Sequence, residues 1–103
     1  MQDNEIKEKI IEEKLRQAVA TIGGKAYKLV SQGNAGMPDR LVCFPGGKAV
    51  FIELKRPKGG KISLLQRYRI TELKVRGFEV RVISTEEQIE QLVKDFDSIG
   101  TRR

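Results

Sequence analysis

Residues 36–55 read GMPDRLVCFPGGKAVFIELK, and this stretch predicts a β-hairpin. Its two apolar runs, Arg40 to Phe44 and Ala49 to Leu54, are separated by the turn residues Pro45-Gly46-Gly47. Runs rich in Val, Ile and Phe on either side of a short glycine-containing turn are typical of paired antiparallel strands. The sequence therefore places two paired strands at the middle of the chain.

The charged residues of this hairpin are expected to meet at its open end. A three-residue turn puts Asp39 opposite Glu53, although a one-residue change in the turn would shift this pair by one position. Cross-strand partners have Cβ atoms about 4.5–5.5 Å apart, and residues two apart in a strand share a face. Lys55 therefore projects beside Glu53, while Leu54 points to the opposite face. The pattern predicts two carboxylates and an ammonium group at one point.

The flanking segments extend the hairpin into a mixed sheet. The expected elements are a helix over residues 4–22, a strand over 25–30, the hairpin strands over 40–44 and 49–54, a helix over 63–76, a strand over 78–83 and a helix over 85–96. Capping boxes mark two helix starts, one formed by Ser63 with Gln66 and one by Thr85 with Gln88. The last strand follows a helical crossover, which favours parallel pairing. We therefore expect an α/β sandwich, a mixed sheet flanked by helices in the order α-β-β-β-α-β-α.

The composition limits the functions open to the chain. With 103 residues we expect one compact domain, in which residues 98–103 form a frayed basic tail. The 20 Lys and Arg exceed the 14 Asp and Glu, and a net charge of +6 favours a polyanionic partner, although a merely soluble basic protein has the same balance. The absence of His and the single Cys43 exclude Ser-His and Cys-His catalysis, His-ligated metal sites and intramolecular disulfides.

Several motifs of other protein classes are missing. No apolar stretch approaches the roughly 20 residues that a membrane span needs, and the first five residues do not begin a signal peptide. The Gly-rich segment Gly33-Asn34-Ala35-Gly36 is neither a Walker nor a dinucleotide motif, so we expect no nucleotide cofactor.

The carboxylate cluster suits metal-assisted phosphodiester hydrolysis. A Glu-x-Lys pair on an exposed strand is usually a structural ion pair, but residues 50–54 are nearly all apolar and predict a strand covered on both faces. A charged pair is costly there unless it serves a function. Oxygen ligands hold Mg²⁺ together with substrate phosphate, and Lys55 can orient water or neutralise developing charge. The backbone carbonyl of Ile52 or Leu54 can add a further ligand.

Three segments carry a resemblance to a known family. The motifs Gly36-Met37-Pro38-Asp39-Arg40, Phe51-Ile52-Glu53-Leu54-Lys55 and Leu65-Gln66 resemble the G-x-P-D-R, E-x-K and Q signature of the VRR-NUC domain, which belongs to the PD-(D/E)xK nuclease superfamily. The resemblance covers about residues 5–95 and implies a restriction-endonuclease-like fold. It also implies Asp39 and Glu53 as ligands of Mg²⁺ or Mn²⁺, Lys55 as catalytic base or stabiliser, and Gln66 as a supporting site residue. The capping-box role of Gln66 competes with this one, and we expect both only if the side chain serves each in turn.

The resemblance further implies a glutamate on the first helix as a site residue and metal ligand. With Ile11 at the centre of the apolar face, helical geometry puts Glu8 at about 60°, Glu12 at about 100° and Glu13 at about 200°. Glu12 also matches an I-E-x-x-L pattern with Ile11 and Leu15. We therefore assign Glu12, with Glu8 as the reserve, although a glutamate on a solvated face needs no such role.

Basic residues around the cluster are expected to contact DNA phosphates. Lys28 and Arg40 flank the predicted site, and Arg56, Lys58 and Lys61 lie in the Gly-rich loop that follows it. Such contacts are independent of base sequence. Simple solvation is the alternative for each of them.

The resemblance implies an endonuclease that recognises branched DNA. We expect a structure-selective enzyme that nicks four-way (Holliday) junctions as a homodimer, in phage or mobile-element recombination and repair. Its location would be cytoplasmic, in the host cell if the chain is phage-encoded. The alternatives are a flap, nicking or restriction-type nuclease of the same fold, or a DNA-binding module without catalysis.

Overall fold

The computed structural model describes residues 3–56 and 59–97, and the predicted tail over 98–103 lies outside them. Its elements are α1 (Asp3–Ala20), β1 (Lys25–Lys28), β2 (Arg40–Phe44), β3 (Lys48–Leu54), α2 (Leu64–Val75), β4 (Glu79–Ile83) and α3 (Glu86–Phe96). This order confirms the predicted α-β-β-β-α-β-α arrangement. The described part of the chain contains no helix that is both long and apolar enough to cross a membrane.

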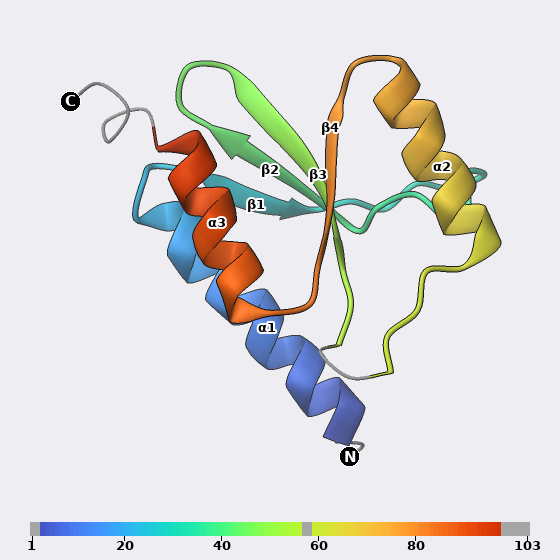
Figure 1. The fold of residues 1–103 in the computed structure, drawn as a ribbon, viewed down its shortest axis with the longest axis horizontal. Coiled ribbons are helices and arrows are strands. Elements are labelled where there is room, and N and C mark those ends of the chain that lie inside the picture. The colour runs from blue at the N-terminus through green and yellow to red at the C-terminus, as the bar shows by residue number, and fades with distance from the viewer. Residues whose placement is uncertain (1–2, 57–58, 98–103) are drawn as a thin grey trace.

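The four strands form one mixed sheet in the order β1-β2-β3-β4. The first three pair antiparallel as a meander, and β4 joins β3 in parallel after the α2 crossover, as predicted. Figure 1 shows α1 and α3 together on one side of the sheet and α2 on the other. The sheet is therefore a sandwich layer whose central strands, β2 and β3, carry the predicted site.

The core lies between the sheet and the α1–α3 pair. Residues two apart in β2 and β3 share this face, so Val42, Phe44, Val50 and Ile52 are all buried. The helices cover them with apolar side chains, namely Ile11, Leu15, Val19, Ile89 and Leu92. The ring of Phe44 stacks on that of Phe96 with centroids 4.8 Å apart. The alternation of buried residues in β2 and β3 therefore shows which side chains point toward α1.

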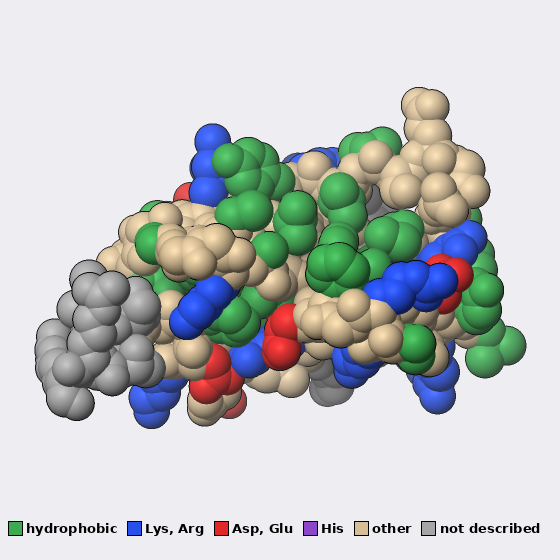
Figure 2. Space-filling view, turned by 90° about the horizontal axis from the view of Figure 1, so that it is seen from above, with side chains coloured by type: hydrophobic (Ala, Val, Ile, Leu, Met, Phe, Trp, Pro, Cys, Tyr) green, Lys and Arg blue, Asp and Glu red, His purple; other side chains and the backbone are tan. Residues whose placement is uncertain are grey.

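The opposite face is covered only in part. Helix α2 has no buried residue, and Phe51 is half-buried, with its ring edge against Phe78. Phe78 remains 51% exposed, and Figure 2 shows hydrophobic side chains gathered on the surface seen from above. The prediction that β3 is covered on both faces therefore holds only for its second half, where Glu53 and Leu54 are both buried.

Element ends follow the capping signals closely. Ser63 and Thr85 are the N-caps of α2 and α3, and both capping boxes are present in full. The first helix ends at Ala20 rather than Ile22, because the chain turns over residues 21–23. Strand β1 stops at Lys28, two residues earlier than predicted.

Candidate active site

The β2–β3 hairpin places Asp39 opposite Glu53. In the ladder Arg40 pairs with Ile52, so the next position beyond it joins Asp39 to Glu53, as the three-residue turn predicted. Oδ1 of Asp39 accepts a hydrogen bond from the backbone nitrogen of Leu54 at 3.2 Å. The hairpin thus holds one carboxylate at the entry of β2 against the exit of β3.

Glu53 is a buried carboxylate with two side-chain partners. Its side chain is only 6% exposed. Oε2 of Glu53 lies 3.2 Å from Nζ of Lys55 and accepts a hydrogen bond from Nε2 of Gln66 at 2.9 Å. A buried charge is tolerated only when it is paired and hydrogen-bonded. Lys55 and Gln66 therefore hold the buried carboxylate of Glu53 in one position.

Gln66 contacts the start of α2 and the Asp39–Glu53 pair, here called the acidic centre, at the same time. Its Oε1 accepts from the backbone nitrogen of Ser63 at 3.0 Å, while its Nε2 donates to Glu53. The expectation that these roles must alternate is wrong, because the carbonyl and amino ends of one amide bond to different partners. The capping box thereby fixes the position of the Gln66 side chain, which donates to Glu53.

Asp39 binds a proton more tightly than an ordinary aspartate does. Burial, and secondly the negative charge of Glu53, raise the pKa of Asp39 from 3.8 to about 6, while the hydrogen bond from Leu54 and the charge of Lys55 act in the opposite direction. Adjacent carboxylates in a partly desolvated place are a donor set that a cation stabilises. Asp39 and Glu53 therefore fit a hard divalent metal ion.

The backbone of Leu54 offers a third oxygen on the same side. Its N–H points to Asp39, and in an extended strand the N–H and C=O of one residue face the same neighbour. The carbonyl of Ile52 has the same direction but lies within the ladder opposite Arg40. The geometry therefore favours Leu54 over Ile52 as a backbone ligand.

Glu12 and Arg40 form an ion pair beside the carboxylates. Oε2 of Glu12 contacts Nη2 of Arg40, and Nη1 of Arg40 donates to the backbone oxygen of Asp39 at 2.9 Å. The Arg40 side chain is only 8% exposed, so it does not have the surface position expected of a phosphate contact. Burial lowers the pKa of Arg40, and the charge of Glu53 opposes this. Arg40 is thus a buried residue that links Glu12 on α1 to the backbone of Asp39.

Glu12 does not form a cluster with Asp39 and Glu53. Within residues 3–56 and 59–97 no three Asp, Glu, His or Cys side chains lie close enough together to hold a metal ion. The reserve residue, Glu8, is exposed on α1. The structure therefore assembles the Asp39–Glu53 pair and leaves Glu12 engaged with Arg40.

Comparison with known proteins identifies the family of this chain. The family model of the VRR-NUC domain matches residues 2–87. The chain belongs to the VRR-NUC domain family. A solved structure described as a VRR_NUC domain superposes with a TM-score of 0.80 at 28% identity, covering 87% of this chain and 97% of that one. The chain is also 43% identical over 82 residues to "Putative nuclease p44" of Acyrthosiphon pisum secondary endosymbiont phage 1. This alignment covers 80% of this chain and 87% of that protein.

The other basic residues predicted to contact DNA in this VRR-NUC domain differ in their exposure. Lys28 is exposed at the end of β1 and pairs in register with Arg40. Arg56 is half-buried and donates to the backbone oxygen of Gly59 at 3.2 Å. Lys61 is exposed, and Lys58 lies outside the described residues.

A contact between the Gly-rich loop and α2 was not foreseen from the sequence. Nε of Arg69 donates to the backbone oxygen of Ala35 at 3.0 Å. A Cβ on Gly36 would lie 2.8 Å from Cγ of Leu65, so glycine allows the loop to pack against the first turn of α2. The glycine of the G-x-P-D-R motif was the available signal. This contact positions the loop that leads into Asp39 beside the helix that carries Gln66.

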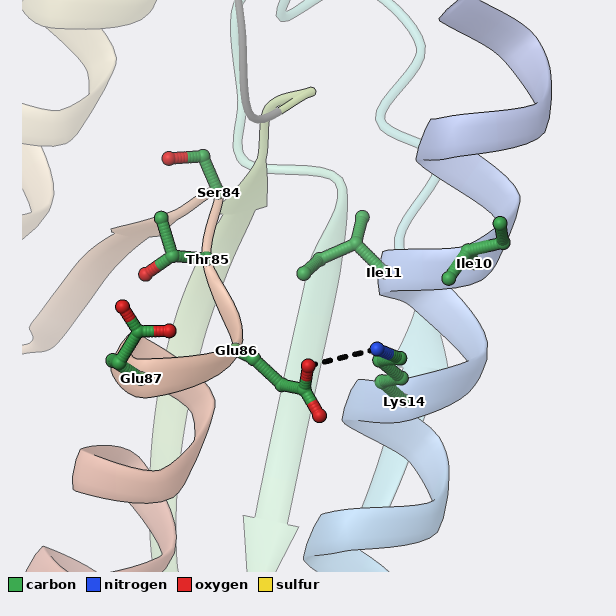
Figure 3. A pocket seen from close by; sticks show the side chains of 7 residues that line it. All are labelled: Ile10, Ile11, Lys14, Ser84, Thr85, Glu86 and Glu87. Carbon is green, nitrogen blue, oxygen red and sulfur yellow. Dashed lines mark hydrogen bonds and ion pairs between the residues drawn. The ribbon is translucent and has the colours of Figure 1, made fainter. Parts of the chain in front are cut away.

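The pocket drawn in Figure 3 is separate from these residues. It has a volume of about 290 Å³ and lies between α1 and the start of α3, where Nζ of Lys14 contacts Oε2 of Glu86 at 2.8 Å. Neither Asp39 nor Glu53 lines it. The carboxylates instead lie at the open end of the β2–β3 hairpin.

Proposed function

We propose that this VRR-NUC domain is a divalent-metal-dependent DNA endonuclease that hydrolyses phosphodiester bonds. The observation that supports it most directly is the pairing of Asp39 with Glu53, with Lys55 Nζ only 3.2 Å from the Glu53 carboxylate. Membership in the VRR-NUC family adds the nuclease class. Together they make acid–base and metal chemistry on a phosphodiester the best fit to the site.

The ligand set that we propose consists of Asp39, Glu53 and the carbonyl of Leu54, with Glu12 added when it leaves Arg40. All are oxygen donors, as Mg²⁺ and Mn²⁺ prefer. A bound ion of this kind would supply a Lewis acid and lower the pKa of a coordinated water. The raised pKa of Asp39, at about 6, means that a proton and a metal ion compete for the same carboxylate.

Side chains next to the ligands perform the remaining tasks. Lys55 is 20% exposed, so its ammonium group reaches solvent from beside Glu53 and can orient the attacking water or neutralise phosphate charge. Gln66 holds Glu53 in place through its 2.9 Å hydrogen bond. Lys28, Arg56, Lys58 and Lys61 are proposed to hold the phosphate backbone of DNA. Arg40 is left out of this set because it is buried.

For the substrate we propose a four-way DNA junction cut by a homodimer. A domain of 103 residues with a net charge of +6 has little surface for reading base sequence but is suited to phosphate contacts. Two copies would provide two sites for symmetric nicking. Flap or plain duplex cleavage by the same site is the competing function.

A cleavage assay tests both levels of the proposal. Four-way junction, flap and duplex DNA of equal concentration are incubated with the protein in Mg²⁺ or Mn²⁺. We expect symmetric nicks in the junction, no cutting by Asp39→Ala or Lys55→Ala, and retained DNA binding by both variants. Lys48→Ala, a change at the exposed opposite end of β3, is the matched control and should remain active. Equal cutting of duplex contradicts junction selectivity, and cutting by Asp39→Ala contradicts the assigned site.

A further inference from the structure

Arg40 and Glu53 are the charged residues that the fold buries most completely among those described. Arg40 is 7% exposed, and its side chain shares the core face of β2 with Val42 and Phe44. This face lies under α1, so the guanidinium must find its partners inside the protein. A buried cation is retained only when anionic or polar groups surround it.

The partners of Arg40 connect α1 to the acidic centre. Nη2 contacts the carboxylate of Glu12, and Nη1 donates to the backbone oxygen of Asp39 at 2.9 Å. Nη1 also lies 4.0 Å from Oδ2 of Asp39. The guanidinium of Arg40 therefore lies next to the carboxylate of Glu12 on α1 and the carboxylate of Asp39 in the proposed metal site.

We infer that Arg40 is a positioning residue that acts as the internal counter-cation of the acidic centre and keeps Glu12 away from Asp39 and Glu53 until a divalent cation replaces its charge. The inference rests on the proposed metal-dependent function. It explains why Glu12, whose side chain is 40% exposed, contacts Arg40 instead of completing a three-carboxylate cluster.

The charge of Arg40 then sets the metal affinity of the site. A fixed positive charge 4.0 Å from the Asp39 carboxylate opposes the binding of another cation there. Removal of this charge should strengthen metal binding by about tenfold or more, because two positive charges a few ångströms apart repel each other even when water screens them fully. If Arg40 only supported the structure, its removal would disorder Glu12 and Asp39 and would weaken metal binding.

The change Arg40→Met separates these outcomes, since methionine fills the buried space without charge. The backbone oxygen of Asp39 keeps its hydrogen bond from the nitrogen of Leu29 at 2.9 Å, so this acceptor is not orphaned. Calorimetric titration of the full chain with Mn²⁺ should give an affinity about tenfold higher for Arg40→Met than for the wild type, while Arg40→Lys, which keeps the charge, stays near the wild type. Thermal unfolding without metal should show a lower Tm for Arg40→Met, and Mn²⁺ should raise that Tm by more than it raises the wild-type value.

Two results would overturn different statements. Mn²⁺ binding by the wild type together with equal or weaker binding by Arg40→Met refutes the role of Arg40 but leaves the proposed nuclease site intact. Failure of the wild type to bind Mn²⁺ or Mg²⁺ refutes the metal site itself.

A measurement on the wild type covers the case in which Arg40→Met does not fold. The side-chain N–H resonances of Arg40, assigned by comparison with Arg40→Lys, should shift on saturation with Mg²⁺ as Glu12 leaves. In the metal-free Glu12→Gln variant the same resonances should already lie near their Mg²⁺-bound positions. Arg40 signals that do not change with Mg²⁺ would refute the inference.

Discussion

Nε2 of Gln66 donates a hydrogen bond to Oε2 of Glu53 at 2.9 Å, so the first turn of α2 is bonded to the end of β3. The other end of the same amide accepts from the backbone nitrogen of Ser63 at 3.0 Å. A single side chain thus satisfies an orphan donor of the helix start and a buried carboxylate. The stability of the helix start and the position of Glu53 are therefore coupled.

Gln66→Ala should destabilise the protein more than Gln88→Ala. Gln88 has the equivalent place in the α3 capping box, where its Oε1 accepts from Thr85 at 3.1 Å. Loss of a cap costs about 1 kcal/mol, and removal of a partner from buried Glu53 should add about 1–3 kcal/mol. Urea unfolding followed by circular dichroism measures both variants. Equal losses would show that the contact with Glu53 contributes nothing to stability.

Gly36→Ala should be more harmful than Gly33→Ala in the same loop. Both glycines have positive φ, +88° and +79°, so alanine is strained at either position by roughly 1 kcal/mol. At Gly36 the new Cβ would also lie 2.8 Å from Cγ of Leu65 and 3.0 Å from its backbone, whereas at Gly33 it meets nothing within 4 Å. We expect Gly36→Ala to lower both the free energy of unfolding and cleavage, because α2 must shift with Gln66. Similar cleavage by the two variants would contradict this.

The hairpin and its site were predictable because local chemistry determines them. The turn over 45–47 fixes the β2–β3 register, and with it the opposition of Asp39 and Glu53. The capping boxes at Ser63 and Thr85 fix the starts of α2 and α3. These features depend on residues close together in the sequence, so they are accessible before the fold is known.

The contacts of Arg40 and Gln66 were less accessible because they depend on how distant elements pack. Arg40 alternates with Val42 and Phe44, so its side chain lies on their face of β2. Its pairing with Glu12, however, requires the position of α1 on the sheet. The bond from Gln66 to Glu53 likewise requires that α2 lie across the end of β3. A basic residue beside a predicted site was therefore assigned to DNA when the fold uses it internally.

The stability of the metal-free protein should depend on pH through Asp39. Its pKa of about 6 in the folded protein exceeds the ordinary 3.8, so folding favours the protonated form. This contribution is complete below about pH 3.8 and is lost as the pH rises through about 6. Because the side chain is 41% exposed, solvent screening limits the effect to about 1 kcal/mol.

The comparison that isolates this effect uses Asp39→Asn in the presence of a chelator. From about pH 4 to about pH 7 the free energy of unfolding of the wild type should fall relative to that of Asp39→Asn. A rise, or parallel curves, would mean that Asp39 is not the carboxylate that holds the extra proton.

Lys55→Met should lower kcat by about 100-fold or more while leaving DNA affinity within about twofold. The ammonium group lies 3.2 Å from the Glu53 carboxylate and the side chain is only 20% exposed, so we expect its charge to act at the reacting phosphate rather than along the DNA backbone. Single-turnover cleavage and gel-shift binding separate the two effects. Lys48→Met, on the same strand, should change neither. A large loss of affinity with unchanged kcat would assign Lys55 to DNA binding.

Lys28 and Lys61 should act through phosphate contacts, which are recognisable by their salt dependence. Lys28 lies at the end of β1, where the nitrogen of Leu29 donates to the backbone oxygen of Asp39 at 2.9 Å. Lys61 follows Gly60, whose backbone is packed so closely that an added Cβ would lie 3.0 Å from Cβ of Lys55. Both lysines are exposed, and each is next in sequence to a residue that packs against the proposed site.

Each lysine that neutralises a phosphate contributes about 0.9 to the slope of log affinity against log salt concentration. We expect Lys28→Ala and Lys61→Ala each to reduce this slope by about 1 and to weaken junction and duplex binding alike, since phosphate contacts carry no sequence information. Lys94→Ala is the matched control, because Lys94 lies in the last turn of α3 on the other side of the sheet from α2. If Lys94→Ala changes the slope as much as the other two variants, the bound DNA is not directed toward Asp39 and Glu53, and the proposed orientation of the substrate is wrong.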